Sequence, residues 1–165
     1  MKVESWPAEL RRFVSRAPEE TLAFGSRLAR ALPRPALLIL AGSLGAGKTV
    51  LAKGLAEGLG VAQADDVASP SYTLIHEYRS AATAFYHIDL YRLETSPQLE
   101  TLGLEDILPG GPSEGGVIAV EWGAKFSLFE GLPRLLVQFT VAADDSREIT
   151  TEWRGPAGVS RPVRD

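Results

Sequence analysis

Residues 36–49 read ALLILAGSLGAGKT, and this stretch decides the fold that we expect for the rest of the chain. Residues 36–41 are a bulky apolar run of the kind that forms a buried strand. The turn that follows, residues 42–49, fits the pattern G-x-x-x-x-G-K-[ST], and residues 50–59 continue as an apolar helical pattern. A strand, a glycine-rich turn and a helix in this order predict a P-loop, which holds a polyphosphate.

Each residue type in this turn suits phosphate binding for a physical reason. Glycine lacks Cβ, so the backbone can adopt φ > 0 and turn its N–H groups inward at the positive end of a helix dipole. Lys48 can place its ammonium on the β and γ phosphate oxygens, while Thr49 can complete the shell of a Mg²⁺ ion. The alternative is a chance match in a glycine-rich chain. The predicted nucleotide-binding stretch consists of Gly42, Ser43, Leu44, Gly45, Ala46, Gly47, Lys48, Thr49 and Val50.

Length and composition limit the domain organisation and the chemistry. The chain has 165 residues, 45% of them hydrophobic, so it is long enough for one buried core. We predict a single domain over residues 1–154 and a disordered tail over residues 155–165, which are mostly proline, glycine and arginine. The absence of cysteine excludes disulfides and thiolate catalysis, and two histidines do not favour a histidine-rich metal site.

The sequence shows no sign of a membrane or secretory protein. It has no apolar run long enough to span a bilayer, and residues 1–7 lack the apolar core of a signal peptide. We therefore expect a cytoplasmic protein with no membrane partner. The net charge of −4 argues against strong non-specific nucleic-acid binding by the isolated chain.

The segments on either side of the P-loop predict further elements. Residues 10–15 alternate enough to form a short strand, and a helix is expected from Pro18 to Leu32. The helix after the P-loop is expected to end near Gly60. The next loop is rich in hydroxyl groups and is either a switch that senses the γ-phosphate or an ordinary turn. The predicted switch residues are Ser69, Pro70, Ser71, Tyr72 and Thr73.

Two apolar strands that end in an acid are predicted beyond this loop. Residues 72–78 and 83–90 alternate as a β-hairpin does, so we expect antiparallel strands beside the P-loop strand. Asp89 lies near the end of the second of these strands, where an acid either steadies Mg²⁺ or caps a turn. Residues 117–122 resemble a buried parallel strand that delivers Glu121 to the ligand-binding edge, although Glu121 alone is also consistent with an arginine pair. Two such acids beside a P-loop favour a functional role.

The remaining segments complete the predicted fold. A capping-box start predicts a helix from Ser96 to about Leu108, and residues 134–141 and 146–154 predict a final hairpin. Arg147 near its turn either reaches a nucleotide or lies on the surface. The fold class that follows is α/β, a P-loop NTPase-like three-layer fold with a mixed parallel and antiparallel central sheet flanked by helices.

Five motifs together carry a resemblance to a known family. They lie at residues 21–25, 42–49, 69–74, 87–92 and 120–122. In this order, over residues 10–153, they resemble the TsaE family of small P-loop ATPases. That family belongs to the bacterial machinery that makes threonylcarbamoyladenosine at the adenosine just 3′ of the anticodon in tRNAs reading ANN codons.

The resemblance implies partners, cofactors and site residues. It implies an ATPase that uses ATP and Mg²⁺ beside the TsaD and TsaB proteins, with tRNA reached only through their complex. The complex, and not this chain, would transfer the threonylcarbamoyl group, and it would stimulate a slow basal hydrolysis. The implied catalytic residues are Asp89, Glu121 and Lys48, the implied metal ligands are Thr49, Glu121 and Asp89, and the further nucleotide neighbours are Trp122, Pro18 and Arg147.

Some positions depart from the family pattern, and other functions stay open. Ser43 stands where the family often has an acid, Ser71 where it often has threonine, and Gly123 where proline is common; none of these changes removes a phosphate or metal group. The competing functions are a P-loop small-molecule kinase and a nucleotide-gated binding module with negligible hydrolysis. Kinases of this class usually carry an arginine-rich lid, and the segment before the final hairpin offers mainly Arg79 and Arg92.

Overall fold

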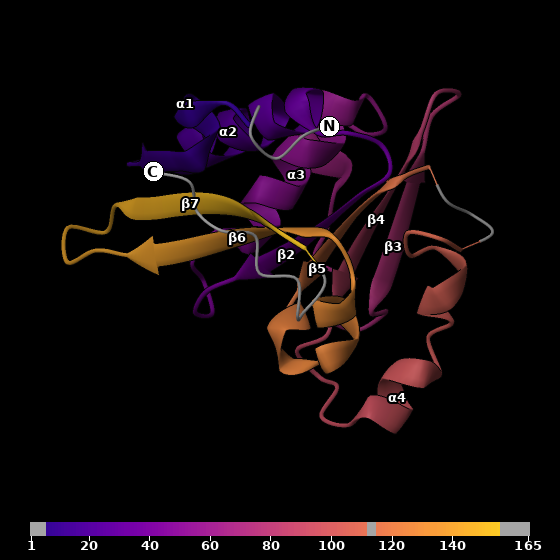
Figure 1. The fold of residues 1–165 in the computed structure, drawn as a ribbon. Coiled ribbons are helices and arrows are strands. Elements are labelled where there is room, and N and C mark those ends of the chain that lie inside the picture. Colours follow the sequence, from indigo (N-terminus) through magenta and orange to yellow (C-terminus); the bar gives the residue numbers. More distant parts are fainter. Residues whose placement is uncertain (1–5, 112–114, 156–165) are drawn as a thin grey trace.

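The computed structural model describes residues 6–111 and 115–155 and shows helices packed on a single sheet (Figure 1). The strands are β1 (Arg12–Ser15), β2 (Ala36–Ala41), β3 (Ile75–Arg79), β4 (Ala84–Asp89), β5 (Val117–Glu121), β6 (Arg134–Val141) and β7 (Arg147–Arg154). The helices are α1 (Ala8–Arg11), α2 (Pro18–Ala31), α3 (Lys48–Leu59) and α4 (Ser96–Glu100). The 3₁₀ turns are η2 (Ala64–Asp66), η3 (Leu104–Asp106), η4 (Gly123–Lys125) and η5 (Ser127–Gly131).

The sheet is mixed, as the sequence predicted, but its parallel strands lie in the middle. The strand order is β1-β7-β6-β2-β5-β4-β3. The pairs β6–β2, β2–β5 and β5–β4 are parallel, while β1–β7, β7–β6 and β4–β3 are antiparallel. The expectation of antiparallel strands beside the P-loop strand was therefore wrong. The reason is that β2 and β5 are apolar on both faces and need cover on both, so they pair with each other at the centre.

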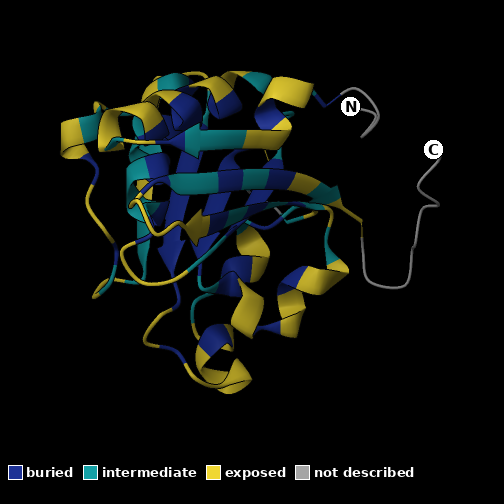
Figure 2. Cartoon of the chain, turned by 90° about the vertical axis from the view of Figure 1, so that its left-hand side faces the viewer, coloured by how far each residue is buried: buried dark blue, intermediate teal, exposed yellow. Residues whose placement is uncertain are grey.

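Two buried cores, one on each face of the sheet, give the fold its three layers. In β2, Leu38 and Leu40 face the core under α2 and α3, whereas Leu37 and Ile39 face the opposite core. The second core is closed by α4 and the 3₁₀ turns rather than by long helices (Figure 1). Figure 2 shows the middle strands buried between these layers, with the exposed residues of the helices on their outer faces. The predicted three-layer α/β class is confirmed.

Helices α2 and α3 pack so closely that glycine is required between them. A Cβ added to Gly54 would lie 2.1 Å from the carbonyl oxygen of Leu22. A Cβ added to Gly25 would lie 2.5 Å from the carbonyl oxygen of Leu51. Neither helix has room to retreat, because each also covers the sheet. This contact holds the first turn of α3, and with it the P-loop, against the start of α2.

Several predicted boundaries differ from the structure for local reasons. Residues 10 and 11 belong to α1, and the predicted first strand starts only at Arg12. The hairpin strand predicted from residue 72 starts at Ile75, because Leu74 adopts φ 69° and its N–H bonds to the carbonyl of Pro70. The final strand begins at Arg147 rather than at residue 146.

The helix predicted up to residue 108 is also shorter than expected. Its capping box is present, with Thr95 as the N-cap and Gln98 as its partner. The helix ends at Glu100, because Gly103 adopts φ 64° and starts the separate turn η3.

The predicted tail and the membrane question can be compared with the structure only for the residues that it describes. Residues 156–165 of the predicted tail lie outside the described part of the chain, which ends at Gly155. Within residues 6–111 and 115–155, no helix has the length and apolar character needed to cross a membrane.

Candidate functional site

The P-loop runs from the carboxyl end of β2 to the first turn of α3. Gly42 and Gly47 adopt φ of 153° and 111°, a conformation that side chains disfavour. A Cβ on Gly42 would also lie 2.9 Å from the Cβ of Phe139, on the neighbouring strand β6. Within the loop, the Ala46 N–H donates to the Ser43 carbonyl at 3.1 Å. The glycine pattern read from the sequence therefore corresponds to real backbone requirements.

Lys48 is folded back onto this loop. Its Nζ donates to the carbonyl oxygens of Gly42 at 2.6 Å and Ser43 at 3.1 Å, and it lies 4.2 Å from the centre of the Trp122 ring. Burial lowers the pKa of Lys48, and the negative charges of Glu121 and Asp89 partly offset this effect. The ammonium is thus held near the mouth of the loop by uncharged carbonyl oxygens, which a negatively charged phosphate oxygen can replace.

Glu121 and Thr49 bring the β5 end and the α3 start together. The Thr49 Oγ1 donates to Glu121 Oε2 at 3.2 Å. Glu121 is the last residue of β5 and is only 4% exposed. β2 and β5 are adjacent and parallel, so the residue that ends β5 lies beside the loop that follows β2. The predicted position of Glu121, at the carboxyl end of an apolar parallel strand, is confirmed. Its role as a metal ligand stays a prediction.

Asp89 is the second acid at this edge. It pairs in register with Glu121 across β4 and β5, and it is 6% exposed. Its Oδ1 accepts the backbone N–H of Tyr91 at 2.9 Å. Burial raises the pKa of Asp89, and the charge of Glu121 adds to the rise, although the Tyr91 N–H, His87 and Lys48 act in the opposite direction. Two buried carboxylates on adjacent strands thus face the P-loop.

A cavity of about 440 Å³ joins the P-loop to both acids. The P-loop and α3 contribute Leu44, Gly45, Gly47, Lys48, Thr49 and Val50 to its lining. The ends of β4 and β5 contribute Asp89, Tyr91, Arg92, Glu121 and Trp122, and the loop after α3 contributes Ser69, Ser71 and Tyr72. The structure therefore brings most of the predicted nucleotide, metal and switch residues to one hollow.

The predicted switch loop forms one exposed wall of this cavity. Tyr72 is 83% exposed, and the Arg92 guanidinium lies 4.2 Å from the centre of its ring. The hydroxyl groups of Ser69 and Ser71 are 2.7 Å apart. Pro70 is buried and, with Thr73, does not line the cavity. The loop is placed to contact a ligand in the cavity, and its role as a switch stays a prediction.

Pro18 and Arg147 lie on the other side of the P-loop and do not line the cavity. Pro18 is the exposed first residue of α2. Arg147 starts β7, and its Nη2 donates to the Gly45 carbonyl at 3.4 Å while its Nη1 donates to the Asp145 carbonyl. Arg147 therefore touches the P-loop, and its contact with a nucleotide stays a prediction.

Two further groups at the site had no role assigned from the sequence. His87 Nε2 lies 2.6 Å from Glu121 Oε2, and the Lys125 ammonium donates to the carbonyls of Tyr91 at 2.9 Å and Leu93 at 3.0 Å. The strand period could have pointed to His87, because residues two apart share a face and Asp89 was already a candidate. Lys125 gave no such signal, because its carbonyl partners Tyr91 and Leu93 are 34 and 32 positions away along the chain.

The donor set suits a hard divalent cation shared with phosphate. Thr49 offers a hydroxyl, and Asp89 and Glu121 offer carboxylates, which are the oxygen ligands that Mg²⁺ prefers. Among the described residues there is no group of three or more His, Asp or Glu side chains that could hold a metal ion alone. Mg²⁺ is commonly held by one or two carboxylates together with phosphates and water, so the residues present fit that arrangement.

A glycine-rich turn that leaves a buried parallel strand and enters a helix, with acids at the ends of neighbouring strands, is the arrangement of P-loop nucleotide-binding proteins. This chain has that fold. Comparison with protein families narrows the class. The family described as "Threonylcarbamoyl adenosine biosynthesis protein TsaE" matches residues 15–149, and the chain belongs to this family.

Individual relatives agree with the family match. The chain is 43% identical over 136 residues to a Bacillus subtilis protein named "tRNA threonylcarbamoyladenosine biosynthesis protein TsaE". The aligned residues cover 81% of this chain and 79% of that relative. The chain is 36% identical over 141 residues to the Treponema pallidum protein of the same name, covering 84% and 98%. Its fold matches the crystal structure of the Bacillus subtilis protein YdiB with a TM-score of 0.67 at 36% identity, covering 85% and 82%.

Proposed function

We propose that this chain is a Mg²⁺-dependent ATPase that is required for the threonylcarbamoylation of tRNAs reading ANN codons, at the adenosine just 3′ of the anticodon. It acts with the TsaD–TsaB complex and does not transfer the threonylcarbamoyl group itself, and it meets tRNA only through that complex. Membership of the TsaE family supports the pathway. The observation that carries the chemistry is the convergence of Lys48, Thr49, Asp89 and Glu121 on one cavity.

The P-loop residues bind and neutralise the triphosphate. The backbone N–H groups of residues 42–49 at the start of α3 receive the phosphate oxygens. Lys48 exchanges its hydrogen bonds to the Gly42 and Ser43 carbonyls for bonds to the β and γ phosphates. Because the ammonium is already buried beside the loop, little reorganisation is needed when the ligand arrives.

The two acids have different tasks in this proposal. Thr49 and Glu121 are the ligands that would hold Mg²⁺, with Asp89 near it, and the ion would offset the charge of the phosphates. Asp89 orients the attacking water in line with the γ-phosphorus. Its raised pKa brings it closer to the value at which a carboxylate is an effective proton acceptor. Trp122, Pro18 and Arg147 complete the surroundings of the nucleotide.

The experiment that tests this proposal is ATP hydrolysis by the purified chain. Hydrolysis is measured with Mg²⁺ alone and after addition of TsaD, TsaB and tRNA, with Lys48→Ala as the blank. We expect slow hydrolysis alone, stimulation by the partners and loss of both in the variant. Equal turnover with and without the partners would contradict the coupling. Transfer of the γ-phosphate to a metabolite pool would instead support a small-molecule kinase.

A second measurement separates hydrolysis from nucleotide-gated binding. The Asp89→Asn protein should retain ATP binding, because the P-loop and Lys48 are intact. If hydrolysis is the essential step, this variant fails to support tRNA modification in the reconstituted system. If modification continues while hydrolysis is lost, the chain is a nucleotide-gated binding module. We further propose that the protein acts in the cytoplasm and that the activity belongs to one domain over residues 1–154.

A further inference from the structure

His87 lies beneath the proposed metal site and has no exposed surface. It is on β4, two residues before Asp89, so both side chains leave the same face of the strand. In the parallel pairing of β4 and β5, His87 is opposite Ala119 and Asp89 is opposite Glu121. The small side chain of Ala119 lets the imidazole extend along β5 toward the acid. Its Nε2 lies 2.6 Å from Glu121 Oε2.

This contact leaves the two oxygens of Glu121 in different situations. Oε2 faces both His87 Nε2 at 2.6 Å and Thr49 Oγ1 at 3.2 Å. Oε1 has only the longer Thr49 contact, at 3.5 Å. An ionised carboxylate only accepts hydrogen bonds, so in the ionised state of Glu121 it is His87 Nε2 that donates in this contact. One oxygen is therefore fixed to the sheet, and the other keeps its lone pairs for a ligand.

Burying an imidazole at this position has a free-energy cost that a purely structural role does not explain. The imidazole is fully buried between the sheet and α3, stacked on Phe85 at 6.2 Å, and its Nδ1 has no hydrogen-bond partner among the described residues. An apolar side chain would fill this space without an unpaired nitrogen. The hydrogen bond to Glu121 is the one polar contact that the His87 side chain makes in the described structure. We therefore expect His87 to act through its hydrogen bond to Glu121.

We propose that His87 is a positioning residue that fixes the rotation of the Glu121 carboxylate, so that Oε1 is presented to the divalent cation that accompanies the nucleotide. The inference rests on the proposed function, since it concerns the same site. A hydrogen bond from a group behind a metal ligand commonly sets the orientation of that ligand. Without His87, Thr49 is the remaining side-chain hydrogen-bond partner of this carboxylate among the described residues, so the carboxylate can rotate and the cation loses a fixed ligand oxygen.

Three substitutions of His87 test this directly. His87→Gln retains an N–H donor the same number of bonds from Cβ as the imidazole Nε2. His87→Asn is also an amide, but its donor is one bond shorter and occupies the position of Nδ1. His87→Leu removes the donor and keeps a buried apolar side chain. The Gln and Asn proteins are matched controls for polarity and burial, so the comparison stands even where the Leu protein fails to fold.

The measurement is binding of ADP to the purified full chain as Mg²⁺ is titrated, with ADP binding in EDTA as the metal-free reference. We expect the Mg²⁺ concentration at half effect to rise about tenfold or more for His87→Leu and His87→Asn, the size usual for groups behind a metal ligand. His87→Gln should stay within about threefold of the wild type, and binding in EDTA should hardly change for any of them. A double substitution with Glu121→Gln should show no further loss from His87→Leu, because the positioned carboxylate is gone.

Each outcome decides the question. Equal Mg²⁺ requirements for the Gln and Asn proteins, a loss of the same size in EDTA, or additive effects in the double variant would overturn the positioning role. These results would leave the proposed function standing, provided that the wild type binds Mg²⁺ with ADP. If the wild type binds no nucleotide with or without Mg²⁺, the proposed function fails and the inference fails with it.

Discussion

The two sides of the P-loop are built differently. On the β5 and β4 side, Glu121 and Asp89 are buried, come from strands in register, and are held by Thr49, His87 and a backbone N–H. On the β6, β7 and β1 side, Pro18 is exposed, and Arg147 reaches the loop through one long hydrogen bond to Gly45. Charges that are buried act through a low dielectric, whereas exposed charges are screened by water and salt.

This difference predicts that residues on the β4 and β5 side determine the rate of hydrolysis, whereas residues on the β6, β7 and β1 side contribute only to nucleotide affinity. Buried groups that are fixed before the ligand arrives can stabilise a transition state, because no solvent has to reorganise. Arg147, a partly exposed arginine at the start of β7, would contribute to binding of the ground state and the transition state alike. Substitutions on the two sides should therefore change different kinetic constants and by different amounts.

The largest effect is expected for Asp89→Asn. We expect kcat for ATP hydrolysis to fall by about 10² to 10⁴, the usual contribution of a positioned acid or base, with little change in the affinity for ADP. The Asn side chain can still accept the Tyr91 N–H, so the local backbone is preserved. Single-turnover hydrolysis and ADP titration measure the two quantities. A tenfold or larger loss of ADP affinity would show that the acid side also governs ground-state binding and would break the contrast.

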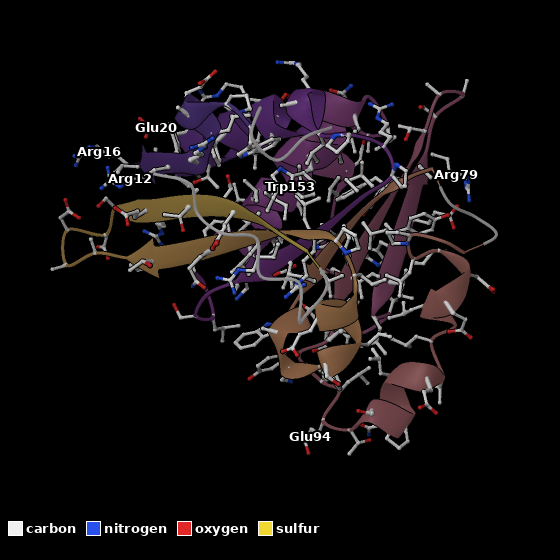
Figure 3. All side chains as sticks on the ribbon, in the orientation of Figure 1. Arg12, Arg16, Glu20, Arg79, Glu94 and Trp153 are labelled. Atoms are coloured by element: carbon white, nitrogen blue, oxygen red, sulfur yellow. The ribbon has the colours of Figure 1, made fainter. Side chains whose placement is uncertain are left out.

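A smaller effect is expected for Arg147→Ala on the exposed side. We expect KM for ATP to rise by about fivefold, corresponding to about 1 kcal/mol for a screened charge, with kcat unchanged. The increase should shrink as salt is raised. Arg79→Ala is the matched control, because Arg79 lies on β3 at the opposite edge of the sheet (Figure 3). A loss in kcat, or an effect equal to that of Arg79→Ala, would contradict this assignment.

The smallest expected effect is a change in the free energy of unfolding of the Asp89→Asn protein that depends on pH. The pKa of Asp89 is raised in the folded protein, chiefly by burial, so its negative charge disfavours folding once it ionises. A group whose pKa is raised in the folded state contributes to folding stability at low pH, where it is protonated. That contribution is lost as the pH rises through the folded-state pKa. Asp89→Asn should therefore raise the free energy of unfolding at neutral pH, and the gain should shrink as the pH falls toward the ordinary aspartate range.

Urea unfolding of both proteins at several pH values, from about pH 5 to about pH 8, measures this difference. Asp144→Asn serves as the control, because Ser146 lowers the pKa of this exposed acid. That substitution should give no gain at neutral pH. A gain for Asp89→Asn that grows on acidification would contradict the stated direction of the Asp89 pKa.

Features that depend on neighbouring residues were predicted well from the sequence. The P-loop strand, its turn and the helix that ends at Leu59 follow from local periodicity and from glycines whose positive φ the structure confirms. Asp89 and Glu121 were placed at strand ends because apolar runs stop there. By contrast, the helix expected up to residue 108 stopped at Glu100, because a glycine conformation inside an otherwise helical pattern is not visible in the periodicity.

The order of the strands was not available from local patterns. The sequence suggested a hairpin beside the P-loop strand, yet β5 lies between them although it follows both in the chain. Hairpin and strand patterns specify which face is apolar but not which strand is the neighbour. The parallel pairing of β5 with both β2 and β4 is what brings Thr49, Asp89 and Glu121 together.

The sequence by itself determined the phosphate-binding loop, the presence of two acid-ended apolar strands and the family resemblance, because each depends on residues a few positions apart. Only the tertiary structure decided that Asp89 lies opposite Glu121, that Lys48 rests against Trp122, and that His87 holds Glu121. These contacts join residues more than 30 positions apart, and their partners are chosen by strand order and packing in the core.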